Sequence, residues 1–348
     1  MKALHVLRSL SLISSRIGQN SSSQHMFVAL TAVDILSQYS DLTENFLRSI
    51  KPNELGQIPA HPHERCLDLF FLNTAELFAI TLTPKASEEL LVSATLPYLA
   101  AGANKHLLEI FEAAHSVVLA VFAIPNNAAV AARHLPFYID NLFAVCEFSP
   151  GIPFFISKTY TSQVFPRNLS ARQFRLAFKT VIQVTAPPSL LANDQPLMSS
   201  ILLEVLYDRA LRASNEILPQ PSQGTDPNNS PSPPLSEQAA LTLALIDSLC
   251  FLRVEDLEEW LPLTAHLINA VSPPNLRDVC VDRLWDALTD GEMDVNRAHY
   301  CVTWWSTKGG RELVLFGAEP GGTGQQQQEP DGAYMSGALE SVARENKL

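Results

Sequence analysis

The stretch "HPHERC" gathers side chains that could bind a metal ion. His61, His63, Glu64 and Cys66 lie close together in the sequence, and imidazole, carboxylate and thiolate groups are the usual ligands of zinc. A short isolated cluster is a weak signal without a complete ligand set, and Pro62 fits a loop that leads into a helix. The sequence therefore favours an exposed loop here, and no metal or other cofactor is expected.

The stretch "CVTWWSTKGGRELVLFG" contains the other candidate for chemistry. Lys308 and Arg311 flank Gly309 and Gly310, and backbone amides at the start of a following helix can bind an anion. A glycine pair is also a helix-stop signal. The sequence favours this second interpretation, in which the glycines end one helix and the segment from Arg311 to Phe316 packs back on the core.

The two neighbouring tryptophans in this stretch cannot face the same way on a helix. One of Trp304 and Trp305 is therefore expected in the core. The other is expected on a surface that meets a partner, where tryptophan is enriched.

Sequence motifs of common enzyme classes are missing. The chain contains no H-E-x-x-H, G-x-S-x-G, G-x-x-x-x-G-K-[ST] or G-x-G-x-x-G pattern. Its 14 glycines leave little material for loops that cradle phosphates. The sequence therefore predicts a protein that is not an enzyme and has no small-molecule substrate.

Charge and cysteine content narrow the class of protein further. The 24 basic and 36 acidic residues give a net charge of −12, which repels phosphate backbones, so nucleic acid is not an expected partner. Five scattered cysteines without a C-x-x-C pair argue against a disulfide framework and a structural zinc site. The longest apolar run, "SVVLAVFAI", is about half of a membrane span. Any membrane contact is therefore expected to be peripheral.

The sequence predicts that the elements that position these residues are helices. Apolar residues recur with the helical period from His25 onward. Ser170 with Gln173 predicts a capping box at one helix start, and Pro125 ends the helix before it. Helices are expected near 25–49, 64–82, 86–99, 104–123, 127–146, 170–184 and 196–217.

The first 33 residues allow two interpretations. They contain Lys2, Arg8 and Arg16, no acid before Asp34, and leucines at helical spacing. This composition is typical of a mitochondrial transit peptide. The sequence favours the alternative, an ordinary amphipathic first helix.

Low-complexity runs divide the chain. "LPQPSQGTDPNNSPSPP" can bury almost nothing and predicts a linker or long surface loop, and "EPGGTGQQQQEPDG" precedes the last residues. The expected parts are an N-terminal segment of uncertain role (1–24), an N-terminal helical domain (25–217), a linker (218–234), a C-terminal helical-repeat region (235–317) and a flexible tail (318–348).

The C-terminal region carries four amphipathic helical patterns joined by "VSPPN", "TDGEMD" and "TKGG". The first pattern is a ladder of Leu241, Leu245 and Leu249, and the second is expected to bend or restart at Pro262. Pro274 is expected at or near a helix start. Two helix pairs of about 40 residues each match the period of HEAT or armadillo repeats, which stack and present an extended surface to partners. The predicted fold is therefore all-α, with stacked helix pairs or a large helical bundle as the two architectures.

The chain ends in "SVARENKL", and Asn346, Lys347 and Leu348 resemble the Ser-Lys-Leu peroxisomal signal. Such a tripeptide is read by a receptor and contributes nothing to the fold. It predicts peroxisomal targeting.

The stretches "PPLSEQAALTLALIDSLCFLRVEDLEEWLPLTAHLINAV", "GEMDVNRAHYCVTWWSTKGGRELVLFG" and "AYMSGAL" resemble the C-terminal half of the fungal peroxin-8 family. The resemblance implies a non-catalytic import factor on the lumenal side of the peroxisomal membrane. Such a factor binds the cargo receptor, links the docking and RING-finger peroxins, and assists cargo release. Two alternatives are a helical-repeat adaptor in mitochondria and a peroxisomal matrix enzyme carried as cargo.

The resemblance assigns a role to individual residues only in the tripeptide of Asn346, Lys347 and Leu348. Polar side chains of the receptor would hold the free carboxylate and backbone, Lys347 would meet acidic groups, and Leu348 would fill an apolar pocket. Asn346 departs from the usual small serine or alanine.

Overall fold

The protein is built from helices, as the sequence predicts. The computed structural model describes residues 1–16, 19–99, 105–143, 164–167, 169–218, 234–289 and 291–317. Within these ranges the one pairing of extended backbone is an isolated antiparallel bridge between Ile217 and Ser236. The all-α class is therefore confirmed.

The N-terminal helices follow the predicted order. They are α1 (Lys2–Leu10), η1 (Ser11–Arg16), α2 (Gln19–Ser37), α3 (Ser40–Ile50), α4 (Pro62–Phe78), η2 (Ala79–Thr81), α5 (Pro84–Ala86), η3 (Ser87–Val92), α6 (Ser93–Leu99), η4 (Lys105–Leu107), α7 (Leu108–Phe122), η5 (Pro125–Asn127) and α8 (Ala128–Phe143).

The single helix expected over 25–49 is wrong, because the chain turns between α2 and α3. Tyr39 has extended backbone angles (φ −127°, ψ 90°). The Thr43 hydroxyl, fully buried, donates to the carbonyl of Leu36 across this corner at 2.8 Å. Neither proline nor glycine marks the turn, so the local sequence carries no strong breaker.

The C-terminal helices also follow the predicted order. They are α9 (Val164–Arg167), α10 (Ala171–Thr185), α11 (Leu190–Asp194), α12 (Met198–Arg212), α13 (Glu237–Ser248), η6 (Leu249–Phe251), α14 (Val254–Ala270), α15 (Pro274–Thr289), α16 (Val295–Thr307) and α17 (Gly310–Phe316).

Several predicted helix ends are confirmed by their chemistry. The Ser170 hydroxyl accepts from the Gln173 amide at 3.3 Å, and the Gln173 side chain accepts from the Ser170 amide at 2.9 Å. This is the predicted capping box. Helix α15 begins at Pro274, where a missing amide costs nothing.

Pro262, where the sequence predicts a bend or a restart, does not interrupt its helix. Helix α14 continues through this proline, although an interior proline usually costs about 3 kcal/mol. Leu257, Leu261 and Ala265 are fully buried on the core side of α14. Their burial holds the segment in one helix.

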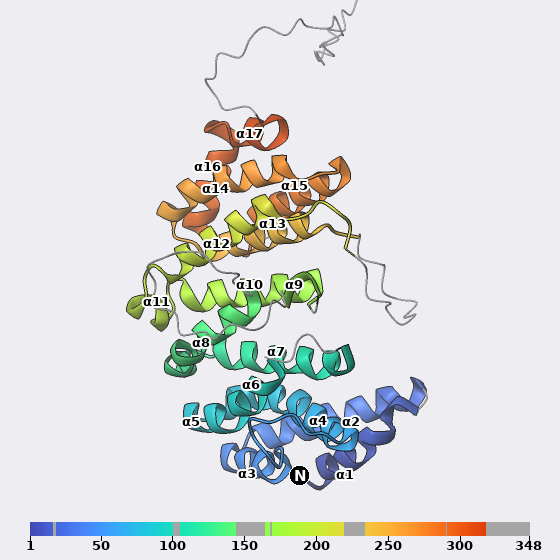
Figure 1. Ribbon diagram of the computed structural model, residues 1–348. Helices are drawn as coiled ribbons and strands as arrows, with labels where there is room; N and C mark the ends of the chain where they lie inside the picture. Colours follow the sequence, from blue (N-terminus) through green and yellow to red (C-terminus); the bar gives the residue numbers. More distant parts are fainter. Residues whose placement is uncertain are drawn as a thin grey trace, which may run out of the picture.

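The helices form layers that succeed one another from one end of the molecule to the other (Figure 1). Helix α7 packs against α4 and α6, α10 packs against α7 and α13, and α14 packs against α17. Each layer therefore buries the apolar face of its neighbours, as in repeat proteins. Of the two predicted architectures, the stack is the one observed.

Helix α13 lies at the centre of the C-terminal layers. It contacts α10, α12, α14 and α15, and all its residues from Gln238 to Ser248 are buried. The predicted ladder of Leu241, Leu245 and Leu249 is fully buried. A helix that is apolar on all sides is buried, and the helices of the neighbouring layers pack on α13.

The two ends of the predicted linker meet. Residues 219–233 lie outside the described ranges, but the amide of Leu218 donates to the carbonyl of Leu235 at 2.9 Å, next to the bridge between Ile217 and Ser236. The helices before and after this point belong to one hydrophobic core. The division into the domains 25–217 and 235–317 stays a prediction.

Helix α1 is amphipathic and packs on the core. Leu4 and Leu7 are buried, and the ring of His5 meets the edge of Phe46 with centroids 5.3 Å apart. Helix α1 therefore buries its apolar stripe and lies against α2.

Membrane-spanning potential is limited to a bent pair of helices. In the described part of the chain, no single helix has both the length and the apolar content needed to cross a bilayer. The segments 108–122 and 125–143 pass this test only together, across a bend of 95°.

Candidate functional site

The predicted targeting residues Asn346, Lys347 and Leu348 lie outside the residues that the structure describes. Their role as a receptor-read signal stays a prediction. The other candidate residues of the sequence are all placed.

The "HPHERC" stretch starts helix α4. His61 is the N-cap, and its Nδ1 accepts from the amide of His63 at 3.1 Å. The rings of these two histidines are 6.2 Å apart, and Cys66 is exposed. No three His, Cys, Asp or Glu side chains approach closely enough to share a metal ion anywhere in the described ranges. The loop-into-helix interpretation is confirmed.

The glycine pair separates two helices, as predicted. Helix α16 ends at Thr307, and Gly309 takes a left-handed conformation with φ of +77°, which costs glycine little and other residues more. Gly310 then begins α17, which packs back against α14 and α16. The helix-stop interpretation is therefore confirmed.

We expect Gly310→Ala to lower the free energy of unfolding by about 1–3 kcal/mol, as overpacking does in a tight core. A Cβ at this position would lie 2.6 Å from two ring carbons of Trp304, which is itself buried. Urea unfolding followed by tryptophan fluorescence would measure the loss. Ser306→Ala, on the exposed face of α16, serves as control and should change stability by less than about 0.5 kcal/mol. An equally small change at Gly310 would contradict the clash.

The tryptophan prediction is confirmed for the core. Trp304 is buried, whereas Trp305 is half-buried and its ring lies 5.4 Å from that of Trp285. Trp285 of α15 is 48% exposed. The role of Trp305 and its neighbour as a partner surface stays a prediction.

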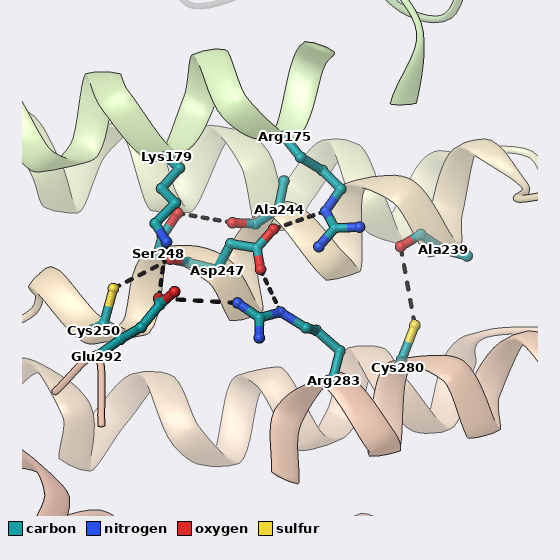
Figure 2. Close-up of polar contacts among 10 residues, drawn as sticks. All are labelled: Arg175, Lys179, Ala239, Ala244, Asp247, Ser248, Cys250, Cys280, Arg283 and Glu292. Atoms are coloured by element: carbon teal, nitrogen blue, oxygen red, sulfur yellow. Dashed lines mark hydrogen bonds and ion pairs between the residues drawn. The ribbon is translucent and has the colours of Figure 1, made fainter. Parts of the chain in front are cut away.

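A charged cluster between α10, α13 and α15 is the polar centre of the C-terminal layers (Figure 2). The carboxylate of Asp247 on α13 accepts from Nε of Arg175 on α10 and from Nε of Arg283 on α15, both at 2.7 Å. The Asp247 side chain is only 7% exposed. One acid therefore joins three helices that belong to successive layers.

A second acid extends this cluster toward the surface. Glu292, in the loop between α15 and α16, accepts from Nζ of Lys179 on α10 at 2.8 Å, and it lies 4.0 Å from a guanidinium nitrogen of Arg283. Figure 2 shows the five charged groups, those of Arg175, Lys179, Asp247, Arg283 and Glu292, facing one another across the helix interfaces. The sequence analysis missed the cluster because its members are far apart in the chain. Its one local signal is Asp247, the charged residue in the otherwise uncharged run from Gln238 to Ser248.

The cysteines beside the cluster are not poised for catalysis. Burial raises the pKa of the Cys250 thiol to about 11 and that of Cys280 to about 12. Their sulfurs lie 3.4 Å and 4.0 Å from the carbonyl oxygens of Asp247 and Ala239 (Figure 2). A protonated buried thiol is a poor nucleophile. The cluster therefore holds helices together and has no activated nucleophile among these groups.

Buried polar pairs also join the N-terminal layers. The Tyr98 hydroxyl of α6 donates to Asp68 of α4 at 2.5 Å, and Nδ1 of His115 on α7 lies 2.8 Å from the Tyr138 hydroxyl on α8. Burial raises the pKa of Asp68 and lowers the pKa of His115 to about 3. His115 is therefore neutral at physiological pH.

Two protein-family models match this chain. Residues 43–123 match the "PEX8 central TPR-like domain", and residues 156–312 match the "PEX8 C-terminal domain". The first range includes helices α4 to α7, and the second includes α10 to α16 with the charged cluster. Neither matched model is that of an enzyme.

Curated yeast proteins are similar over most of the chain. The chain is 25% identical over 337 residues to "Peroxisomal membrane protein PEX17" of Yarrowia lipolytica, covering 89% of this chain and 47% of the relative. It is 25% identical over 338 residues to "Peroxisomal biogenesis factor 8" of Komagataella phaffii, covering 87% and 46%. It is 24% identical over 307 residues to the protein of that name in Pichia angusta, covering 87% and 44%.

The chain spans about half the length of the curated relatives it matches. No solved structure matches it.

Proposed function

The chain belongs to the PEX8 family of peroxisomal biogenesis factors, and from this premise we propose that it is a non-catalytic scaffold in the import of peroxisomal matrix proteins. In this role it binds the cargo receptor on the lumenal side of the membrane and links the docking and RING-finger peroxins. It also assists the release of cargo. Its contact with the membrane is peripheral.

The observation that carries the proposal is the order of the two family domains along one stack of helices. Residues 43–123 and 156–312 together cover the layers from α4 to α16. A stack of this kind exposes a new surface with each layer, so that separate partners can bind at separate places. The relatives' names support peroxisome biogenesis and a peroxisomal location, rather than the mitochondrial alternative.

The tripeptide Asn346, Lys347 and Leu348 is proposed as one contact with the receptor. The chemistry is that of a carboxyl-terminal signal: a carboxylate for polar side chains, a lysine for acidic groups and a leucine for an apolar pocket. A scaffold needs further contacts with the docking and RING-finger peroxins, because the tripeptide alone is also what a cargo protein offers.

We expect the full chain to capture the peroxisomal signal receptor from fungal extract together with docking or RING-finger peroxins. A version lacking 346–348 should capture less receptor, because one of its contacts is lost, and should still capture the other peroxins. Immunoblotting of the bound fraction measures both.

Three results would overturn parts of this proposal. Receptor capture that depends wholly on the tripeptide, with no other peroxin, would identify the chain as cargo. Equal capture by both versions would remove the role of the tripeptide and leave the scaffold in place. The absence of receptor and of peroxins with both versions would overturn the scaffold itself.

A further inference from the structure

A groove of about 410 Å³ lies over three successive layers of the stack. Its walls come from α4, α7 and α10, which follow one another in Figure 1. Helix α7 packs against both of the other two. The groove therefore crosses from the central domain of the family into the C-terminal domain.

The charge of the groove is of one sign. Three carboxylates line it, from Glu76 on α4 and from Glu109 and Glu112 on α7, whereas no lysine or arginine does. None of the three forms an ion pair or a side-chain hydrogen bond with another described residue. Elsewhere in the stack, acids such as Asp247 and Glu88 are paired with arginines. Glu76, Glu109 and Glu112 therefore bring three unneutralised charges together in one groove.

Keeping Glu76 ionised without a cation beside it costs free energy. Its side chain is half-buried, and burial raises the pKa of its carboxyl, which means that the ionised form is penalised by loss of water. A cation placed beside it would recover this cost. The groove therefore favours a ligand that carries positive charge.

His115, which lines the groove, has a buried ring nitrogen without a partner. Its side chain lines the groove and is 4% exposed. Its Nδ1 is turned to Tyr138, which does not line the groove, and its buried Nε2 has no hydrogen-bond partner among the described residues. Buried polar atoms are rarely left without a partner.

Apolar side chains complete the lining. Leu69 of α4 and Leu119 of α7 are half-buried, and Leu176 of α10 is 58% exposed. A ligand that met the carboxylates with cations alone would leave these leucines in water. The groove thus suits a ligand with basic side chains on one face and apolar side chains on another.

We propose that this acidic groove binds a basic amphipathic segment of a protein partner. The proposal rests on the scaffold function for the identity of the partner, which would belong to the import machinery. It rests on charge complementarity, the unpartnered His115 and the exposed leucine for the chemistry of the segment.

The test uses the full chain and a fluorescent amphipathic peptide of leucine and lysine as the probe, with fluorescence anisotropy as the measurement. We expect Glu109→Lys with Glu112→Lys to weaken binding at least about tenfold, which is the scale of one or two close charge pairs. The matched control is Glu258→Lys with Glu259→Lys, on the exposed face of α14. It makes the same change in net charge and should weaken binding less than about twofold.

Two further variants keep the test decisive. Glu109→Gln with Glu112→Gln removes the charge without adding bulk, and it should weaken binding several-fold. It therefore tests the groove even if the lysine pair disturbs folding. Leu176→Ala should weaken binding, whereas Leu190→Ala, with similar exposure on α11, should not.

Equal losses in groove and control variants would show that the net charge of −12 attracts the peptide, and would overturn the proposal. Binding of a leucine–glutamate peptide with similar affinity would do the same.

Capture from extract separates the failure of this proposal from the failure of the scaffold function. If the groove is a partner site, the glutamine variant loses at least one peroxin that the unaltered chain retains. If the unaltered chain captures no peroxin, the scaffold function fails whatever the peptide does. If both chains capture the same peroxins and bind the peptide equally, the groove proposal fails and the scaffold function stands.

Discussion

Asp247→Asn is expected to lower the free energy of unfolding by about 3–5 kcal/mol, the usual cost of removing one member of a buried charge pair. The substitution keeps the shape of the side chain but leaves the guanidinium groups of Arg175 and Arg283 facing a neutral amide. These arginine side chains are 27% and 23% exposed, so water can compensate them only in part. Equilibrium urea unfolding, followed by circular dichroism, measures the change.

Asp208→Asn provides the matched control. Asp208 pairs with Arg212 on the surface of α12, where both side chains are more than half exposed. Exposed pairs of this kind contribute between zero and about 1 kcal/mol. A loss at Asp247 as small as that at Asp208 would show that the cluster is well hydrated and does not hold the layers together.

Phe174→Ala is expected to lower the free energy of unfolding by about 3–5 kcal/mol, because it opens a cavity in a core that is already closely packed. Phe174 of α10 is fully buried. Its ring stacks on Phe165 and Phe178 at 4.6 Å and 6.2 Å and meets the edge of Phe143 at 6.1 Å. Urea unfolding again measures the loss.

Gln183→Ala on the same helix is the control for Phe174→Ala. Gln183 is exposed, and alanine has the higher helix propensity, so the change should stay within about 0.5 kcal/mol. A loss below about 1 kcal/mol for Phe174→Ala would mean that the neighbouring rings collapse into the space.

Local chemistry explains which helix ends could be predicted. The side chains of Ser170 and Gln173 bond to free amides at a helix start, and Pro274 lacks an amide that would be free there. Gly309 adopts the left-handed conformation that ends a helix. Each lies where the sequence predicted it. The corner at Tyr39 was missed because a buried hydroxyl of Thr43, rather than a breaker residue, holds it. The interruption predicted at Pro262 does not occur, because burial of α14 outweighs the cost of a proline inside a helix. Prediction therefore succeeded where the cause is local and failed where packing decides.

The candidate sites follow the same division. The cap made by His61 and the stop at Gly309 depend on adjacent residues and could be inferred. The carboxylate of Asp247 meets arginines that lie 72 and 36 positions away, and the acidic groove joins three helices. Only the order of the layers brings these groups together, and that order is not a property of any short stretch.

The bridge between Ile217 and Ser236 makes the packing of the stack independent of the residues that connect its two sides. Leu218 is hydrogen-bonded to Leu235, so the described residues on either side of 219–233 meet at one point of the stack. Helix α13 then packs against α10 and α12. Doubling the length of a flexible loop between such fixed ends costs only about 0.6 kcal/mol of closure entropy. The packing of the layers on either side therefore depends little on how many residues join 218 to 235.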